Sequence, residues 1–160
     1  MASEGIAVVV TRRAQASPER AFDVIVPVDL AAVFTGYGPL PAVKGTQDQT
    51  GDWNAAGQTR RINLSDGSNT SERIDHCERP GHFAYTVGPF HGPIGAIVDH
   101  ADGAWWFYSA EDGETLIRWR YTWVPKHRIF NAILWPVTRL WQRYAEQVLD
   151  RCVELVEADA

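Results

Sequence analysis

Four side chains in the middle of the chain are of the types that transfer protons or bind polar ligand atoms, namely Arg60, Glu72, His76 and Tyr85. Each lies two residues from an isoleucine, valine or phenylalanine, in a segment with the alternating pattern of a β-strand. Side chains two residues apart on a strand project to the same face of the sheet. The pattern therefore predicts that all four point inward with their apolar neighbours.

The turn signal Asp66–Gly67 lies between the segments that carry Arg60 and Glu72. A two-residue turn would place Glu72 opposite Arg61, whereas a bulged turn would place it opposite Ile62 and diagonal to Arg60. The bulged register satisfies the apolar pattern of both strands, so it is the register we expect.

These residues support two interpretations. In the functional one, Arg60 stabilises an enolate or binds a ligand oxygen, Glu72 or His76 is the general acid or base, and Tyr85 donates a hydrogen bond. In the structural one, Arg60 and Glu72 form a buried ion pair that fixes strand register, and His76 is hydrogen-bonded at the sheet edge. A buried charge without a partner is costly, so both interpretations predict the pair.

Several other chemistries are disfavoured by the sequence. It contains neither Gly-x-Gly-x-x-Gly after a strand, nor the phosphate-binding Gly-x-x-x-x-Gly-Lys motif, nor the Gly-x-Ser-x-Gly nucleophile motif. Cys77 falls on the outer face if Ile74 faces inward, which argues against a nucleophile. His76 and Cys77 are adjacent and would point to opposite faces, so we expect no metal site and no cofactor.

The elements that position these residues follow from the order of turn and helix signals. Residues 6–11 form a β-branched run, Ser17–Pro18 begins a short helix that Pro27 ends, and Asp29 caps a second short helix. Residues 88–95 are expected to be a loop. Closely spaced turn signals after residue 43 indicate antiparallel hairpins. The predicted later strands are residues 58–64, 70–77, 83–87, 104–109 and 115–124.

Apolar residues recur at helical spacing from Phe130 to Leu155, which predicts one long amphipathic C-terminal helix. A helix is about 10–12 Å wide, whereas about seven strands span roughly 30 Å. We therefore expect an α+β fold in which a curved antiparallel sheet wraps around the helix and leaves a cavity beneath it.

The chain contains 7 Trp, 6 Phe and 5 Tyr but only 1 Met, and many of the rings belong to the expected inner face. The sequence leaves open whether Trp105 or Trp106 points inward, the other ring then lying outward, where it could form a subunit contact. It also leaves open whether Trp53 is a cavity wall or a ring on a surface turn. The predicted ligand contacts are Trp53, His76, Phe83, Phe107, Trp119, Tyr121, Val137, Trp141 and Tyr144.

Bulk composition sets broader limits. A chain of 160 residues is the size of one domain, expected here to span residues 1–160. Its net charge of −5 disfavours nucleic acid as a partner. Two isolated cysteines, no signal peptide and no transmembrane segment indicate a cytoplasmic protein, either a monomer or a homodimer.

A set of short motifs runs along nearly the whole chain: Ser17-Pro-Glu-Arg-Ala-Phe22, Gly57-x-x-Arg60, Asp66-Gly67 followed by Glu72, Pro80 to Tyr85, Gly113-x-Thr115-x-x-x-Trp119 and the C-terminal helix. Together these motifs resemble the START/Bet v 1-like (SRPBCC) superfamily, in particular its polyketide cyclase/dehydrase and lipid-transport branch. The resemblance implies a helix-grip fold that encloses an apolar cavity.

The expected function is binding of a hydrophobic small molecule of polyketide, aromatic or lipid type between sheet and helix. Two further hypotheses differ in the fate of the bound molecule. An enzyme would fold a poly-β-keto chain for cyclisation and dehydration, whereas a carrier needs a cavity and a gate but no acid–base geometry. A regulatory interaction protein is a third possibility, for which an outward tryptophan would be the mark.

Overall fold

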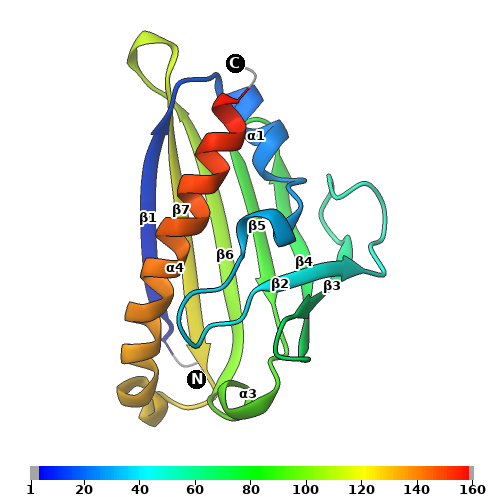
Figure 1. The fold of residues 1–160 in the computed structure, drawn as a ribbon, viewed down its shortest axis with the longest axis vertical. Coiled ribbons are helices and arrows are strands. Elements are labelled where there is room, and N and C mark those ends of the chain that lie inside the picture. The colour runs from blue at the N-terminus through cyan, green and yellow to red at the C-terminus, as the bar shows by residue number, and fades with distance from the viewer. Residues whose placement is uncertain (1–3, 159–160) are drawn as a thin grey trace.

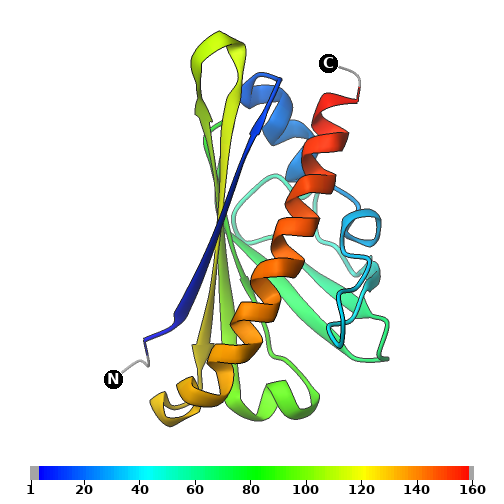
Figure 2. The same ribbon diagram turned by 60° about the vertical axis from the view of Figure 1, so that its left-hand side comes forward.

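The computed structural model describes residues 4–158 and contains one seven-stranded antiparallel sheet with the strand order β1-β7-β6-β5-β4-β3-β2. A long helix, α4 (Asn131–Glu157), lies across one face of this sheet (Figure 1). Figure 2 shows that the sheet bends so that β2 and β3 come round toward the side of α4. The predicted α+β helix-grip fold is confirmed. The strands are β1 (Ile6–Ala14), β2 (Val43–Gln47), β3 (Thr59–Leu64), β4 (Asn69–Glu78), β5 (His82–Val87), β6 (Val98–Ser109) and β7 (Thr115–Pro125).

Two short helices, α1 (Pro18–Ile25) and α2 (Leu30–Val33), connect β1 to β2 across the sheet. The Ser17 side chain accepts a hydrogen bond from the Arg20 backbone N–H at 3.2 Å, which caps α1 as expected. The Arg20 guanidinium in turn donates to the Val156 carbonyl at 3.1 Å. These contacts hold α1 beside the C-terminal end of α4.

The segment before β6 differs from the expected loop. A short helix, α3 (Gly92–Ile97), begins there with a proline in its first turn, and β6 starts at Val98, six residues before the predicted strand. Asp102–Gly103 has the composition of a turn, yet it lies inside the strand. The structure explains this, because Gly103 pairs with Tyr85 of β5 and leaves room for the tyrosine ring.

The space between the sheet and α4 is filled by aromatic rings. Trp105 stacks on Trp119 with ring centroids 4.6 Å apart, and Tyr121 lies 4.6 Å from Trp141 of α4. Trp105 is therefore the inward ring, because its register places it opposite Trp119. Trp106 faces outward, opposite Arg118.

Gly103→Ala tests the placement of the Tyr85 ring over β6. The added methyl group would overlap the ring, so we expect a loss of about 1–3 kcal/mol in the free energy of unfolding. Gly45→Ala, in β2, is the matched control, because a methyl group there meets no atom within 4 Å and should change stability by less than about 0.5 kcal/mol. Equal effects of the two substitutions in urea denaturation would contradict this placement.

Candidate functional site

A buried ion pair joins β3 to β4 on the inner face. Arg60 and Glu72 are direct cross-strand partners, and the Arg60 Nε donates to a Glu72 carboxylate oxygen at 3.0 Å. Only 6% of the Arg60 side chain and 5% of the Glu72 side chain are exposed. The predicted inward orientation of both residues and their pairing agree with the structure.

The predicted register of this hairpin is wrong. The Leu64 N–H donates to the Ser68 carbonyl at 2.9 Å, which closes a three-residue loop around Asp66–Gly67. Gly67 adopts a φ of 88°, the left-handed conformation that such a loop requires at its last position. This loop places Glu72 opposite Arg60, rather than opposite Ile62 as the bulged turn would have done.

The Trp53 ring covers the Arg60 side chain of the ion pair. The Arg60 guanidinium carbon lies 4.0 Å from the centroid of the Trp53 ring, a cation–π contact. Trp53 is buried, so the ring belongs to the interior and not to a surface turn. Its indole N–H has no hydrogen-bond acceptor among the described residues.

Tyr85 of β5 extends this polar cluster toward β7. Its hydroxyl oxygen accepts a hydrogen bond from the indole N–H of Trp119 at 3.1 Å. Burial raises the pKa of Tyr85, and the nearby Glu72 carboxylate raises it further. Burial likewise raises the pKa of Tyr121, with Tyr85 and Glu72 adding to the effect. Both phenols therefore stay protonated at neutral pH and can act as donors.

The Glu72 carboxyl experiences two opposing effects. Burial raises its pKa, and the positive charge and hydrogen bond of Arg60 offset only part of that rise. A carboxyl with a raised pKa takes up a proton more readily than an exposed one, as a general acid must. The cluster thus combines one cation, one carboxyl group and two phenol donors in an apolar interior.

His76 does not join this cluster. A β-bulge between Ile74 and His76 shifts the register of β4, so the His76 ring is exposed, 3.2 Å from a Glu78 carboxylate oxygen and beside the His82 ring. The predicted inward orientation of His76 is wrong because of this one extra residue. The same shift brings Cys77 opposite Phe83 and against the core, contrary to its expected outward position.

The other predicted ligand contacts lie on the inner side of the sheet or on the sheet-facing side of α4. All are buried except Val137, which is half-buried; the buried ones are Phe83, Phe107, Trp119, Tyr121, Trp141 and Tyr144. Phe34 was not among the predicted contacts, although its ring lies 6.2 Å from both Trp119 and Trp141. The only signal for Phe34 was its place at the end of a short helix before a glycine-rich loop.

Tyr144 of α4 forms hydrogen bonds with the glycine-rich loop that follows Phe34. The Tyr144 hydroxyl donates to the Pro41 carbonyl at 2.9 Å and accepts from the Gly36 N–H at 3.0 Å. The Tyr37 ring stacks on the Tyr144 ring with centroids 6.3 Å apart. Residues 34–42 therefore cover the aromatic interior beside α4.

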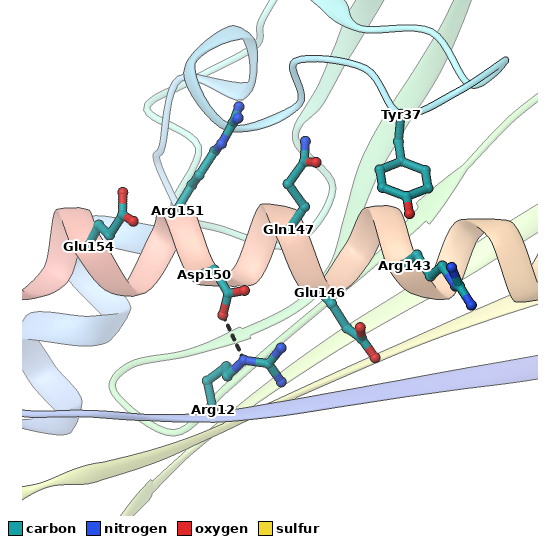
Figure 3. A pocket seen from close by; sticks show the side chains of 8 residues that line it. All are labelled: Arg12, Tyr37, Arg143, Glu146, Gln147, Asp150, Arg151 and Glu154. Atoms are coloured by element: carbon teal, nitrogen blue, oxygen red, sulfur yellow. Dashed lines mark hydrogen bonds and ion pairs between the residues drawn. The ribbon is translucent and has the colours of Figure 1, made fainter.

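The structure differs from the expected cavity, because the rings of Trp119, Tyr121, Trp123 and Trp141 pack against one another under α4. Two hollows indent the surface elsewhere. One, of about 670 Å³, lies between β1, α4 and Tyr37 and is lined mainly by charged side chains, including the pair Arg12–Asp150 with atoms 2.7 Å apart (Figure 3). The other, of about 300 Å³, lies over the outer face of the sheet beside Trp106 and Arg120.

Residues 4–158 lack two other kinds of feature. No cluster of three or more His, Cys, Asp or Glu side chains in this range is arranged to hold a metal ion. No helix in the same range combines the length and the apolar character needed to cross a membrane.

Comparison with known proteins supports the fold assignment. TTHA0849 from Thermus thermophilus matches with a TM-score of 0.68 at 18% identity, over 94% of this chain and 97% of that one. Ara h 8.0201 matches with a TM-score of 0.67 at 16% identity, over 95% of this chain and 97% of its own. No family model and no curated protein matches the sequence.

A third solved structure is the di-domain ARO/CYC BexL from the BE-7585A biosynthetic pathway. It matches with a TM-score of 0.69 at 18% identity over 98% of this chain, which spans 51% of the BexL chain. At 16–18% identity, these matches show that the chain shares its fold with the three solved structures.

A double-mutant cycle tests the ion pair. Arg60→Met and Glu72→Leu should each lower the free energy of unfolding by about 3–5 kcal/mol, because each leaves a buried charge without its partner. The double substitution should lower it far less than the sum of the two. Urea denaturation measures all four proteins, and additive losses would mean that the two charges do not interact.

The pKa of Glu72 also predicts a pH dependence. Because this pKa is raised above its ordinary value of 4.5, the folded chain holds the proton more tightly than the unfolded chain does. The resulting stabilisation is complete below the unfolded pKa and is lost as pH rises through the folded pKa. We expect the Glu72→Gln variant to show no such fall in the free energy of unfolding as pH rises. Unfolding curves between about pH 4 and 8 measure it, and identical pH slopes in the two proteins would contradict it.

Proposed function

We propose that this chain binds a hydrophobic small molecule of polyketide, aromatic or lipid type between the inner face of the sheet and α4. The buried Arg60–Glu72 pair in an interior of aromatic rings carries the proposal. A buried ion pair contributes little net stability compared with apolar residues of similar volume. Its position is better explained as a polar anchor for a ligand oxygen, with the protonated Tyr85 as a second donor.

Unpaired indole groups support a ligand with further oxygen atoms. The N–H groups of Trp123 and Trp141 are buried and have no acceptor among the described residues, and the two rings lie 5.6 Å apart. A buried donor without an acceptor costs about 1–3 kcal/mol. A ligand with an apolar body and several carbonyl oxygens would accept hydrogen bonds from these indole N–H groups and from Arg60.

The loop of residues 34–42 is the proposed entrance. Phe34 lies between the rings of Trp119, Trp141 and Tyr144, and the hydrogen bonds of the Tyr144 hydroxyl hold the loop in place. Withdrawal of Phe34 would open the aromatic interior directly beside α4. The ligand would then take the place of this ring.

Catalysis of cyclisation and dehydration is a second candidate, favoured by the register of β4 and β5, which places Glu72 diagonal to Tyr85 on the inner face. Arg60 and Tyr85 would stabilise the oxygen of the attacked carbonyl while a new carbon–carbon bond forms. The Glu72 carboxylate would take the proton from the attacking α-carbon and pass it to the carbonyl oxygen, which becomes a hydroxyl. In the dehydration it would carry a second proton from that carbon to the hydroxyl, which leaves as water. The ARO/CYC description of BexL belongs to that protein and supports this candidate only through the shared fold.

Native mass spectrometry of the freshly purified protein, followed by identification of the retained molecule, tests ligand binding. We expect the wild type to carry an apolar molecule and the Arg60→Met/Glu72→Leu variant to lose it while remaining folded. Arg61→Gln is the matched control, because Arg61 lies on the same strand but is exposed. Equal retention by the double variant, or no apolar ligand on the wild type, would refute the proposal.

A different variant, Glu72→Gln, separates a carrier from an enzyme. With the identified molecule as substrate, an enzyme would bind it in Glu72→Gln but lose turnover, because the amide cannot donate a carboxyl proton. A carrier would return the molecule unchanged from the wild type and from Glu72→Gln alike.

A further inference from the structure

The start of α4 and the 3-10 turn that precedes it, Arg128–Phe130, expose large apolar side chains to solvent. The exposed fraction is 67% for Ile129, 60% for Ile133 and 56% for Trp135. Ala132 and Pro136 are exposed beside them. We call this surface, together with the cations Lys126, Arg128 and Arg139 and with Arg143 further along α4, the α4 tip; Arg143 also lines the charged hollow of Figure 3.

The apolar part of the α4 tip covers the whole outward side of the first helical turns. Leu134, Thr138 and Trp141 are buried, so positions 132, 133, 135 and 136 make up the opposite side. The outward side of a surface helix is ordinarily polar. A contiguous exposed apolar surface of this kind marks a site of contact with a partner or a membrane.

The charge of the α4 tip is opposite to that of the molecule. The segment from Lys126 to Arg143 contains four Lys and Arg and no Asp or Glu, in a chain with a net charge of −5. None of the four forms an ion pair with a described residue. The Arg139 guanidinium instead lies 5.2 Å from the centre of the Trp135 ring. The tip thus presents unpaired cations beside an aromatic and aliphatic surface.

The neighbouring segment has a compatible surface. The Lys126 N–H donates to the Ile97 carbonyl at 2.8 Å, which places the end of α3 against the α4 tip. Residues 88–98 contain no Asp, Glu, Lys or Arg. The adjoining strand ends contribute two carboxylates, Glu4 and Asp99, and Asp99 lies 2.7 Å from the His100 ring nitrogen.

The opposite end of the molecule is acidic on balance, although Arg13, 3.5 Å from Glu114, and Arg20 and Arg151 also lie there. The turn between β6 and β7 contains Glu111, Asp112 and Glu114, and the end of α4 contains Glu154 and Glu157. Figures 1 and 2 both show α3 and the start of α4 at one end of the long axis, and this turn and the end of α4 at the other. A negatively charged surface would therefore attract the molecule with the α4 tip foremost.

We propose that the α4 tip docks on an anionic lipid surface. Tryptophan and isoleucine suit the boundary between headgroups and acyl chains, and cations beside them meet the lipid phosphates. A second copy of this chain fits less well, because a two-fold contact would bring the same four cations together. This proposal rests on other residues than the proposed ligand site, so either can fail without the other.

Cosedimentation with lipid vesicles tests the proposal. We expect the full chain to bind vesicles of phosphatidylserine and phosphatidylcholine in equal parts, and to bind phosphatidylcholine alone far more weakly. Trp135→Ala should weaken binding roughly tenfold or more. Removal of cations by Arg139→Gln and Arg143→Gln should weaken it roughly fivefold for each cation and reduce its dependence on salt.

Two controls match these variants. Tyr108→Ala removes an exposed aromatic ring, and Arg61→Gln an exposed cation, elsewhere on the molecule, so neither should weaken vesicle binding. Absence of binding to the anionic vesicles, or equal losses in variants and controls, would overturn the proposal. So would a dimer that Trp135→Ala dissociates, or retention on poly-glutamate without vesicle binding, which would assign the tip to a second copy or to an acidic polypeptide.

Discussion

One helix has to cover the concave face of a seven-stranded sheet, and the interior depends on how this mismatch in width is resolved. α4 packs on β1 and β7, at one side of the sheet. Large rings of β5, β6 and β7 extend from there toward the middle, where Trp119 contacts Trp105, Tyr121 and Trp141. Rigid rings span the gap that a second helix would fill in a fold with two covering helices. The aromatic composition of the chain is thus a consequence of its having one long helix.

The same mismatch explains where the polar cluster lies. β3 and β4 are too far across the sheet for α4 to cover, and the segment between β2 and β3 covers them instead. Backbone hydrogen bonds from Gly57 to Ile74 and from Ile74 to Gln58 fasten that segment to β4. Trp53, held at a left-handed φ of 58°, then closes over Arg60. A loop, and not a helix, therefore shields the ion pair from water.

Turn signals, the helical spacing of the C-terminal segment and the family resemblance together predicted the fold. Alternation along the strands predicted the inward positions of Arg60, Glu72 and Tyr85. It failed at His76 because a bulge adds one residue without any side-chain signature, and every later position on β4 changes face. The hairpin register depended on the conformation of Gly67, which the sequence does not specify. Trp105 and Trp106 were likewise distinguishable only through pairing with β7. Local pattern thus predicted the inward residues of β3, of β5 and of β4 before its bulge, whereas bulge and loop geometry decided the later faces of β4 and the cross-strand partners.

The strand order has a consequence for how the chain acquires its structure. Within this sheet β1 is synthesised before the other strands, yet its partner is β7, and Ile6 pairs with Trp123, more than a hundred residues later. The hairpins from β3 to β7 can form from local contacts, whereas β1 has no neighbour until nearly the whole chain exists. Contacts of such long sequence separation slow folding, because a large loop must close before they form. During synthesis on the ribosome, the β-branched first strand therefore waits unpaired until the strand that completes the sheet has emerged.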